Sequence, residues 1–187
     1  MIKRFLSCFS LSKRGFEVEN LVHQHLISHE INVFREKDIK KHYGMNISGI
    51  DHMYFTHHFC TNQIQYVLIQ TKYYNKPVSI KDCHHFIKCC YDIYHLEKGL
   101  YSLTCIMLSK NGLSKPSKKS FQDENIKQKQ LSFIDINGVN SDEMIYNLNT
   151  FLTQQHLLFS TKNKKRKLSH HYFKYIKYPS CKRIKYT

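Results

Sequence analysis

The chain has no tryptophan and no alanine, and its 187 residues include only three prolines and six glycines. Lysine, isoleucine, asparagine and tyrosine are frequent instead, a residue usage that is typical of an AT-rich genome. Long hydrophobic runs are also missing, because no stretch approaches the roughly 20 apolar residues that a transmembrane helix needs. The sequence therefore predicts no membrane-spanning protein, although its 41% of hydrophobic residues is enough for the core of one ordinary domain.

The cysteines form no CxxC pair. They are odd in number, scattered and mostly inside apolar segments: Cys8, Cys60, Cys83, Cys89, Cys90, Cys105 and Cys181. This usage is typical of structural thiols in a reducing compartment, so we expect a cytoplasmic protein, or a nuclear one if the host is eukaryotic. Zinc sites favour CxxC or HxxxH pairs with a second pair at a distance, a pattern that "HHFC" at 57–60 and "CHHFIKCC" at 83–90 fit poorly.

Acidic residues are missing from residues 162–187, which hold ten of the 29 lysines and arginines and thus +10 of the net charge of +15. Tyrosine and phenylalanine interleave with these cations. Cations release counterions when they meet phosphate, and aromatic rings stack on unpaired bases. We expect this tail to bind DNA through Lys164, Lys165, Arg166, Lys167, Lys174, Lys177, Lys182 and Arg183. A nuclear address and a solvated, disordered end are the alternative interpretations.

The amino terminus, "MIKRFLSCFSLSKRGF", has no acidic residue before Glu17. Basic flanks around an apolar stretch occur in signal and transit peptides, but this stretch is short and no small-x-small cleavage site follows it. We therefore expect a first strand or arm that packs on the domain. The chain then divides into an N-terminal arm (1–14), one domain (15–160) and a basic, aromatic-containing tail (161–187).

Hydrophobic periodicity predicts an α/β domain. Apolar residues at helical spacing indicate helices over 15–30, 79–94 and 141–159, with Ser79 as a possible N-cap of the second. Extended apolar segments indicate strands at 31–34, 50–55, 63–74, 100–109 and 131–136. The strand at 63–74 has an almost continuous apolar middle, which predicts burial on both faces. The polar segments 35–49 and 110–130 are expected to be loops, with an irregular helix as the alternative for the second.

The segment "YVLIQTK" places Gln70 and Lys72 on one face of a strongly apolar strand. Burial of an amide or an ammonium there costs free energy unless the group is paired. Asp51 starts the preceding strand, and an antiparallel neighbour of suitable register would bring its carboxylate close to both. Glu19 belongs to the buried face of the first helix, whereas Glu17 points elsewhere and is the fallback. An acid, an amide oxygen and an ammonium are therefore expected to converge.

Two carboxylates and an amide oxygen are hard ligands that suit Mg²⁺, for which Mn²⁺ can substitute. Such an ion acts as a Lewis acid on a phosphodiester and lowers the pKa of water, while a lysine orients that water or offsets charge on the phosphorane. We expect Asp51, Gln70 and Glu19 to be metal ligands and Lys72 to complete the catalytic set. Each also has an ordinary explanation: a snorkelling lysine, an amide that satisfies the backbone, a turn aspartate and a solvated helix glutamate.

At these residues the sequence resembles the PD-(D/E)xK nucleases, and among them the Mrr-like restriction endonucleases. The resemblance lies in "GFEVE" ahead of "LVHQHL", in "GID", and in "VLIQTKYYNKPVS", over about residues 15–140. It implies a restriction-endonuclease-like three-layer core, an α/β fold with a mixed central sheet between helices. It also implies that the acid after the glycine binds metal, that glutamine replaces the usual acid and that the lysine is catalytic. Ile50 stands where the motif has proline, and Gln70 removes one negative ligand.

The resulting expectation is a Mg²⁺-dependent deoxyribonuclease that acts as an endonuclease on DNA. A Holliday junction resolvase is a related alternative, which would require a homodimer that presents two sites. A catalytically inactive nuclease fold that only binds nucleic acid is the alternative from a different class. His84 and His85 fall on the polar face of the second helix, where they are either solvated or in contact with phosphate.

Overall fold

The computed structural model describes residues 2–29, 31–43, 48–57, 64–99, 101–155 and 157. Within these ranges the chain forms helices α1 (Ile2–Ser28), α2 (Glu36–Tyr43), α3 (Ile80–Leu96), α4 (Lys115–Lys127) and α5 (Ser141–Gln154). The strands are β1 (Phe34–Arg35), β2 (His52–His57), β3 (Ile64–Lys72), β4 (Ser102–Ser109) and β5 (Leu131–Asn137). No helix of this described part is long and apolar enough to cross a membrane.

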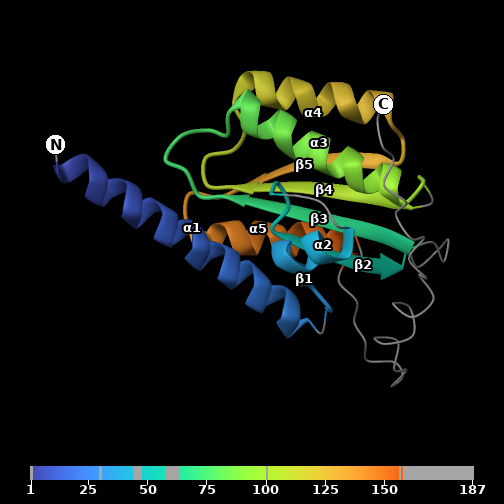
Figure 1. Cartoon of the computed structure of the whole chain (residues 1–187), viewed down its shortest axis with the longest axis horizontal. Helices are drawn as coiled ribbons and strands as arrows, with labels where there is room; N and C mark the ends of the chain where they lie inside the picture. Colours follow the sequence, from blue (N-terminus) through green and yellow to red (C-terminus); the bar gives the residue numbers. More distant parts are fainter. Residues whose placement is uncertain are drawn as a thin grey trace, which may run out of the picture.

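The strands form one mixed sheet in the order β1-β2-β3-β4-β5. The pairs β1–β2 and β2–β3 are antiparallel, whereas β3–β4 and β4–β5 are parallel. Figure 1 shows α3 and α4 on one face of this sheet and α1 and α5 on the other. The predicted fold class, α/β with a mixed central sheet flanked by helices in three layers, is confirmed.

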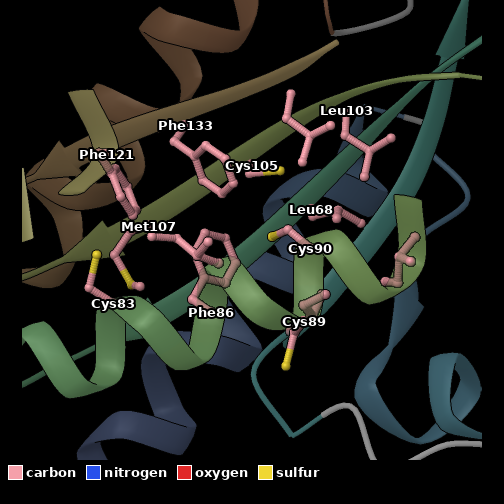
Figure 2. Packing of buried hydrophobic residues seen from close by; sticks show 14 of the residues in the cluster. Leu68, Cys83, Phe86, Cys89, Cys90, Leu103, Cys105, Met107, Phe121 and Phe133 are labelled. Atoms are coloured by element: carbon pink, nitrogen blue, oxygen red, sulfur yellow. The ribbon is translucent and has the colours of Figure 1, made fainter. Parts of the chain in front are cut away.

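Each face of the sheet has its own hydrophobic core. On the α3/α4 face, Leu68 and Met107 of the sheet pack with Phe86 of α3, and four buried cysteines lie in or beside this cluster. Figure 2 shows the Cys105 side chain beside the Phe133 ring, whereas the Cys89 sulfur points away from the labelled aromatic rings. On the other face, Val67 and Ile69 pack with buried residues of α1 and α5. Because β3 contributes to both clusters, its predicted burial on both faces is confirmed.

The second predicted helix is confirmed as α3, and its predicted cap forms. The Ser79 hydroxyl oxygen accepts a hydrogen bond of 3.2 Å from the Asp82 backbone N–H, which satisfies one of the free donors of the first turn. The opposite end leads into β4 through Lys98 and Gly99, which both have positive φ. The strand expected at 31–34 is reduced to the two residues of β1.

Two helices occupy segments for which a loop was predicted. Helix α2 lies in 35–49 with Ile39 as its one buried residue, so it lacks the apolar periodicity that would have revealed it. Acidic residues in its first turn and basic residues in its last turn complement the helix dipole instead. Helix α4 lies in 110–130, follows Ser114 and carries a proline in its first turn, which agrees with the alternative interpretation of that segment.

Helix α1 begins at Ile2, so residues 2–14 are helical where a strand or separate arm was expected. Apolar residues at 2, 5, 6 and 9 do have helical spacing, and Gly15 within the helix obscured this continuity. Most of the hairpin connection expected at "HHFCTN" (57–62), the end of the last predicted helix and the basic tail at 161–187 lie outside the described residues, whereas His57 is the last residue of β2.

Candidate active site

Asp51 lies directly before β2 and is fixed to β3 by two hydrogen bonds. Its backbone N–H donates to the Ile69 carbonyl at 2.9 Å, and its carboxylate Oδ2 accepts from the Thr71 N–H at 2.6 Å. The pairing of His52 with Ile69 in the antiparallel ladder places Asp51 beside Gln70. The short hairpin thus brings the "GID" and "QTK" segments together.

The Asp51 carboxyl group is poorly stabilised as an anion. Burial, together with the nearby carboxylates of Glu19 and Glu36, raises its pKa to about 7. The Thr71 N–H and the Lys72 ammonium oppose this shift without cancelling it. A buried carboxyl with neighbouring acids and a raised pKa is a common feature of functional sites, because a bound cation can relieve its charge.

Glu19 lies on α1 and shares a pocket with Asp51. Burial raises the pKa of Glu19, Lys72 opposes the shift, and Glu36 adds to it. The pocket has a volume of about 230 Å³ and is lined by Phe16, Glu19, Asn20, Arg35, Glu36, Lys37, Asp51 and His52. Glu17, the fallback residue, is exposed.

Gln70 is only 2% exposed, and its side-chain oxygen Oε1 has no hydrogen-bond partner among the described residues. An unpaired buried acceptor of this kind costs on the order of 1–3 kcal/mol. Gln70 does not line the pocket of Glu19 and Asp51, but it is the strand neighbour of Asp51. Its oxygen is therefore one of several buried polar atoms of this region without a partner among the described residues, together with Thr71 Oγ1 and His52 Nδ1.

Lys72 ends β3 and is half-buried. Its ammonium lowers the pKa of both Asp51 and Glu19, so it is the positive charge that acts on both carboxylates. It forms no salt bridge within the described ranges, and its Nζ lies 5.7 Å from the centre of the Tyr74 ring. Strand alternation places Lys72 on the same face as Gln70.

The sequence did not identify three further residues that line the pocket: Glu36, Arg35 and Asn20. Glu36, the first residue of α2, adds a third carboxylate to the pocket and also pairs with Lys40 at 2.8 Å. Arg35 Nη1 donates to Asn20 Oδ1 at 2.9 Å and thereby ties β1 to α1. The available signal was the acidic start of the "EKDIKKHY" segment, which a charge-based rule for helix termini would have detected.

A histidine pair lies at the pocket, which His52 helps to line. His52 of β2 is 2% exposed and stacks on His23 of α1, with ring centres 5.6 Å apart. Burial lowers the pKa of both rings, to about 3 for His52, with Arg35 adding to the shift. Both rings are therefore neutral near pH 7 and provide packing between α1 and the sheet, not charge.

The structure brings Asp51 and Glu19 together in one pocket, whereas Gln70, the third predicted ligand, does not line it. The two carboxylates with raised pKa values are oxygen ligands that suit a hard divalent cation such as Mg²⁺ better than zinc. No group of three or more histidine, cysteine, aspartate or glutamate residues suited to a metal occurs in the part of the chain that is described.

His84 and His85 are exposed on α3, and His85 Nε2 lies 3.1 Å from the Ser48 hydroxyl.

No protein-family model matches the sequence, and no curated protein matches it either. A solved structure that resembles the chain is the DNA modification-dependent restriction endonuclease AspBHI, at 7% sequence identity and a TM-score of 0.37. The similarity covers 78% of this chain and 40% of that one, so the chain spans about two fifths of its structural relative. The order and direction of the strands define the fold here, and a likeness at this level adds no family or activity.

Proposed function

We propose that this protein is a metal-dependent DNA endonuclease of the PD-(D/E)xK type, with Asp51, Glu19, Gln70 and Lys72 as its catalytic residues. The observation that carries the proposal is the electrostatic coupling of Lys72 to two partly buried carboxylates from different elements, α1 and the start of β2. Structural ion pairs lower the pKa of a carboxylate, whereas both of these pKa values are raised. Such a cluster is destabilising unless a ligand compensates for it.

The fit of the donor oxygens supports Mg²⁺ as the cofactor, with Mn²⁺ as a substitute. When bound, the ion supplies Lewis acidity toward a phosphate oxygen and lowers the pKa of a water molecule. Asp51 and Glu19 would hold the ion through their carboxylates, and the Gln70 oxygen would supply the neutral third ligand. The Thr71 N–H fixes one carboxylate oxygen of Asp51, so the other is oriented for the ion.

Lys72 would act on the phosphate. Its ammonium can donate hydrogen bonds to a nonbridging oxygen and offset the charge that builds up on phosphorus as water attacks. The new bond joins the water oxygen to phosphorus, the bond from phosphorus to the leaving oxygen breaks, and a proton transfers to that oxygen. The products are a phosphate monoester and a free hydroxyl group on the DNA.

The basic tail would add affinity without sequence preference. Its eight cations from Lys164 to Arg183, named above, have no acidic neighbour within residues 162–187 and suit the phosphates of DNA. These residues lie outside the described part of the structure, so this role rests on their sequence alone. Deletion of residues 162–187 should reduce DNA affinity and flatten its salt dependence while cleavage of bound DNA remains.

A plasmid-nicking assay with Mg²⁺, Mn²⁺ or a chelator tests the proposal. We expect nicking by the wild type with either ion, none with chelator, and a loss of at least about 100-fold in Lys72→Ala and Asp51→Asn. Lys129→Ala is the matched control, because Lys129 is an exposed lysine before the start of β5, at the opposite edge of the sheet from the end of β3. Metal-independent binding without any nicking would instead identify a DNA-binding protein that has lost the activity.

The same assay separates the two nuclease alternatives. A junction resolvase requires a homodimer with two sites, so it should prefer a four-way junction over linear duplex and sediment as a dimer. An enzyme of the restriction type should cut linear duplex at least as well. A monomer that nicks plasmid excludes the resolvase alternative.

A further inference from the structure

Two loops next to Lys72 are joined into one rigid unit. The β3–α3 loop and the β4–α4 loop both leave the carboxyl ends of parallel strands, and such ends meet at one edge of a sheet. The Val78 N–H donates to the Gly112 carbonyl at 2.9 Å, and the Ser114 N–H donates to the Val78 carbonyl at 3.1 Å. The Lys110 N–H donates to the Lys72 carbonyl at 3.1 Å.

Side chains of the second loop fix the conformation of the first. Asn111 Nδ2 donates to the Tyr74 carbonyl at 2.6 Å, and Lys110 Nζ donates to Asn75 Oδ1 at 3.1 Å. Lys110 Nζ also lies 5.0 Å from the centre of the Tyr73 ring, which packs on the α1/α5 core. The backbone on both sides of Tyr74 is therefore fixed before any ligand binds.

The Tyr74 ring is the part of this unit that faces solvent. Tyr74 is 43% exposed, whereas Tyr73 is half-buried. The Tyr74 ring contacts no other aromatic ring among the described residues. The Lys72 ammonium lies 5.7 Å from the ring centre, and Lys72, Lys76 and Lys110 make no salt bridge in the described ranges. An exposed aromatic ring beside the Lys72 ammonium matches a nucleotide, which offers a flat base and a phosphate.

We propose that Tyr74 is a stacking platform for an unpaired base next to the scissile phosphate, and that the enzyme prefers single-stranded or unpaired DNA at this position. The proposal rests on the proposed nuclease function, because it places the phosphate at Lys72. One nucleotide can then contact the Lys72 ammonium with its phosphate and the Tyr74 ring with its base. A base within a duplex has both faces covered by its neighbours, so only an unpaired base can use this ring.

Binding in chelator, where no cleavage occurs, tests the platform. The probe is a short single-stranded oligonucleotide with one 2-aminopurine, whose fluorescence is quenched by stacking, and its fully paired duplex is the comparison. We expect Tyr74→Ala to weaken single-strand binding about 5- to 150-fold and to relieve the quenching. Affinity for the duplex should not change, and Tyr74→Phe should behave as the wild type because it retains the ring.

Tyr146→Ala is the matched control, because Tyr146 is an exposed tyrosine of α5, which covers the face opposite to α3 and α4. The aromatic residues of the tail are the same in all variants. Equal loss of single-strand and duplex binding in Tyr74→Ala, or no loss at all, would overturn the platform. Tyr74-dependent quenching without metal-dependent nicking of any DNA would preserve the platform and overturn the nuclease function.

Discussion

The Asp51 carboxylate accepts a 2.6 Å hydrogen bond from the Thr71 N–H, yet the pKa of this carboxyl is raised to about 7. A hydrogen bond from a backbone N–H favours the ionised form, so burial and the neighbouring carboxylates outweigh it. The bond orients Asp51 and the surroundings make its charge unfavourable. This combination suits a carboxylate whose charge is to be compensated by a ligand.

Asp51→Asn should stabilise the metal-free protein above pH 7. The folded-state pKa lies above the usual value of 3.8, so the folded protein binds more protons between these values and loses stability as the pH rises from about 4 to 7. Asparagine keeps the acceptor for Thr71 without the charge. Chemical denaturation at pH 8 should show a gain of up to about 4 kcal/mol in the free energy of unfolding. The exposed carboxylate variant Asp123→Asn should give no gain, and equal stability of Asp51→Asn and wild type would contradict the prediction.

Glu36→Gln should move the acid limb of the pH–rate profile to lower pH. Glu36 raises the pKa of both Asp51 and Glu19, so removal of its charge lets both ionise more readily. Measurements of nicking rate against pH in saturating Mg²⁺ report this shift. Lys40→Ala is the control, because it breaks the 2.8 Å ion pair but leaves the Glu36 carboxylate in place. An acid limb that moves equally in both variants would show that the ion pair, not the charge near Asp51, matters.

Gln70→Glu should make the protein more dependent on divalent metal for its stability. A third carboxylate at a position that is 2% exposed would add an uncompensated buried charge, at a cost of several kcal/mol without metal. Thermal melts at pH 8 should show a lower melting temperature in chelator and a larger increase on addition of Mg²⁺ than the wild type shows. In Gln70→Leu the increase of the melting temperature on addition of Mg²⁺ should be lost. If this variant shows the same increase as the wild type, Gln70 is excluded as a ligand.

Gly49→Ala should destabilise the contact between the "GID" segment and α3. An added Cβ would lie 2.9 Å from the Cys89 Sγ and 3.1 Å from the His85 ring, so these side chains of α3 would have to move. Overpacking of this kind costs about 1–3 kcal/mol. In a double-mutant cycle with Cys89→Ala, which removes the sulfur, most of the loss should be restored. Additive losses would locate the strain elsewhere.

The secondary structure was predictable where one hydrophobic pattern determines each element. Strand β3 and helix α3 were identified because a continuous apolar run and a spacing of three and four residues mark them. Helix α2 could not be found in this way, since Ile39 alone is buried and its ends are marked by charge. The reach of α1 to Ile2 was hidden by Gly15, because glycine usually disfavours a helix interior.

The relative placement of part of the candidate site was predictable, but its surroundings were not. Strand alternation placed Gln70 beside Lys72, and the hairpin register placed Asp51 next to them, because both follow from local spacing. The contribution of Glu36 depends on where α2 packs relative to α1, which no local pattern encodes. The Tyr74 platform likewise depends on hydrogen bonds from Asn111, a residue 37 positions further along the chain.

Strand β1 ends after two residues, and one of them is Arg35, which is bonded to α1. Edge strands of a sheet can pair with strands of other molecules through their unpaired backbone groups. A short edge strand that carries a charge offers little for such pairing. The edge of the sheet beside the carboxylate pocket is therefore protected from pairing with a strand of a second chain.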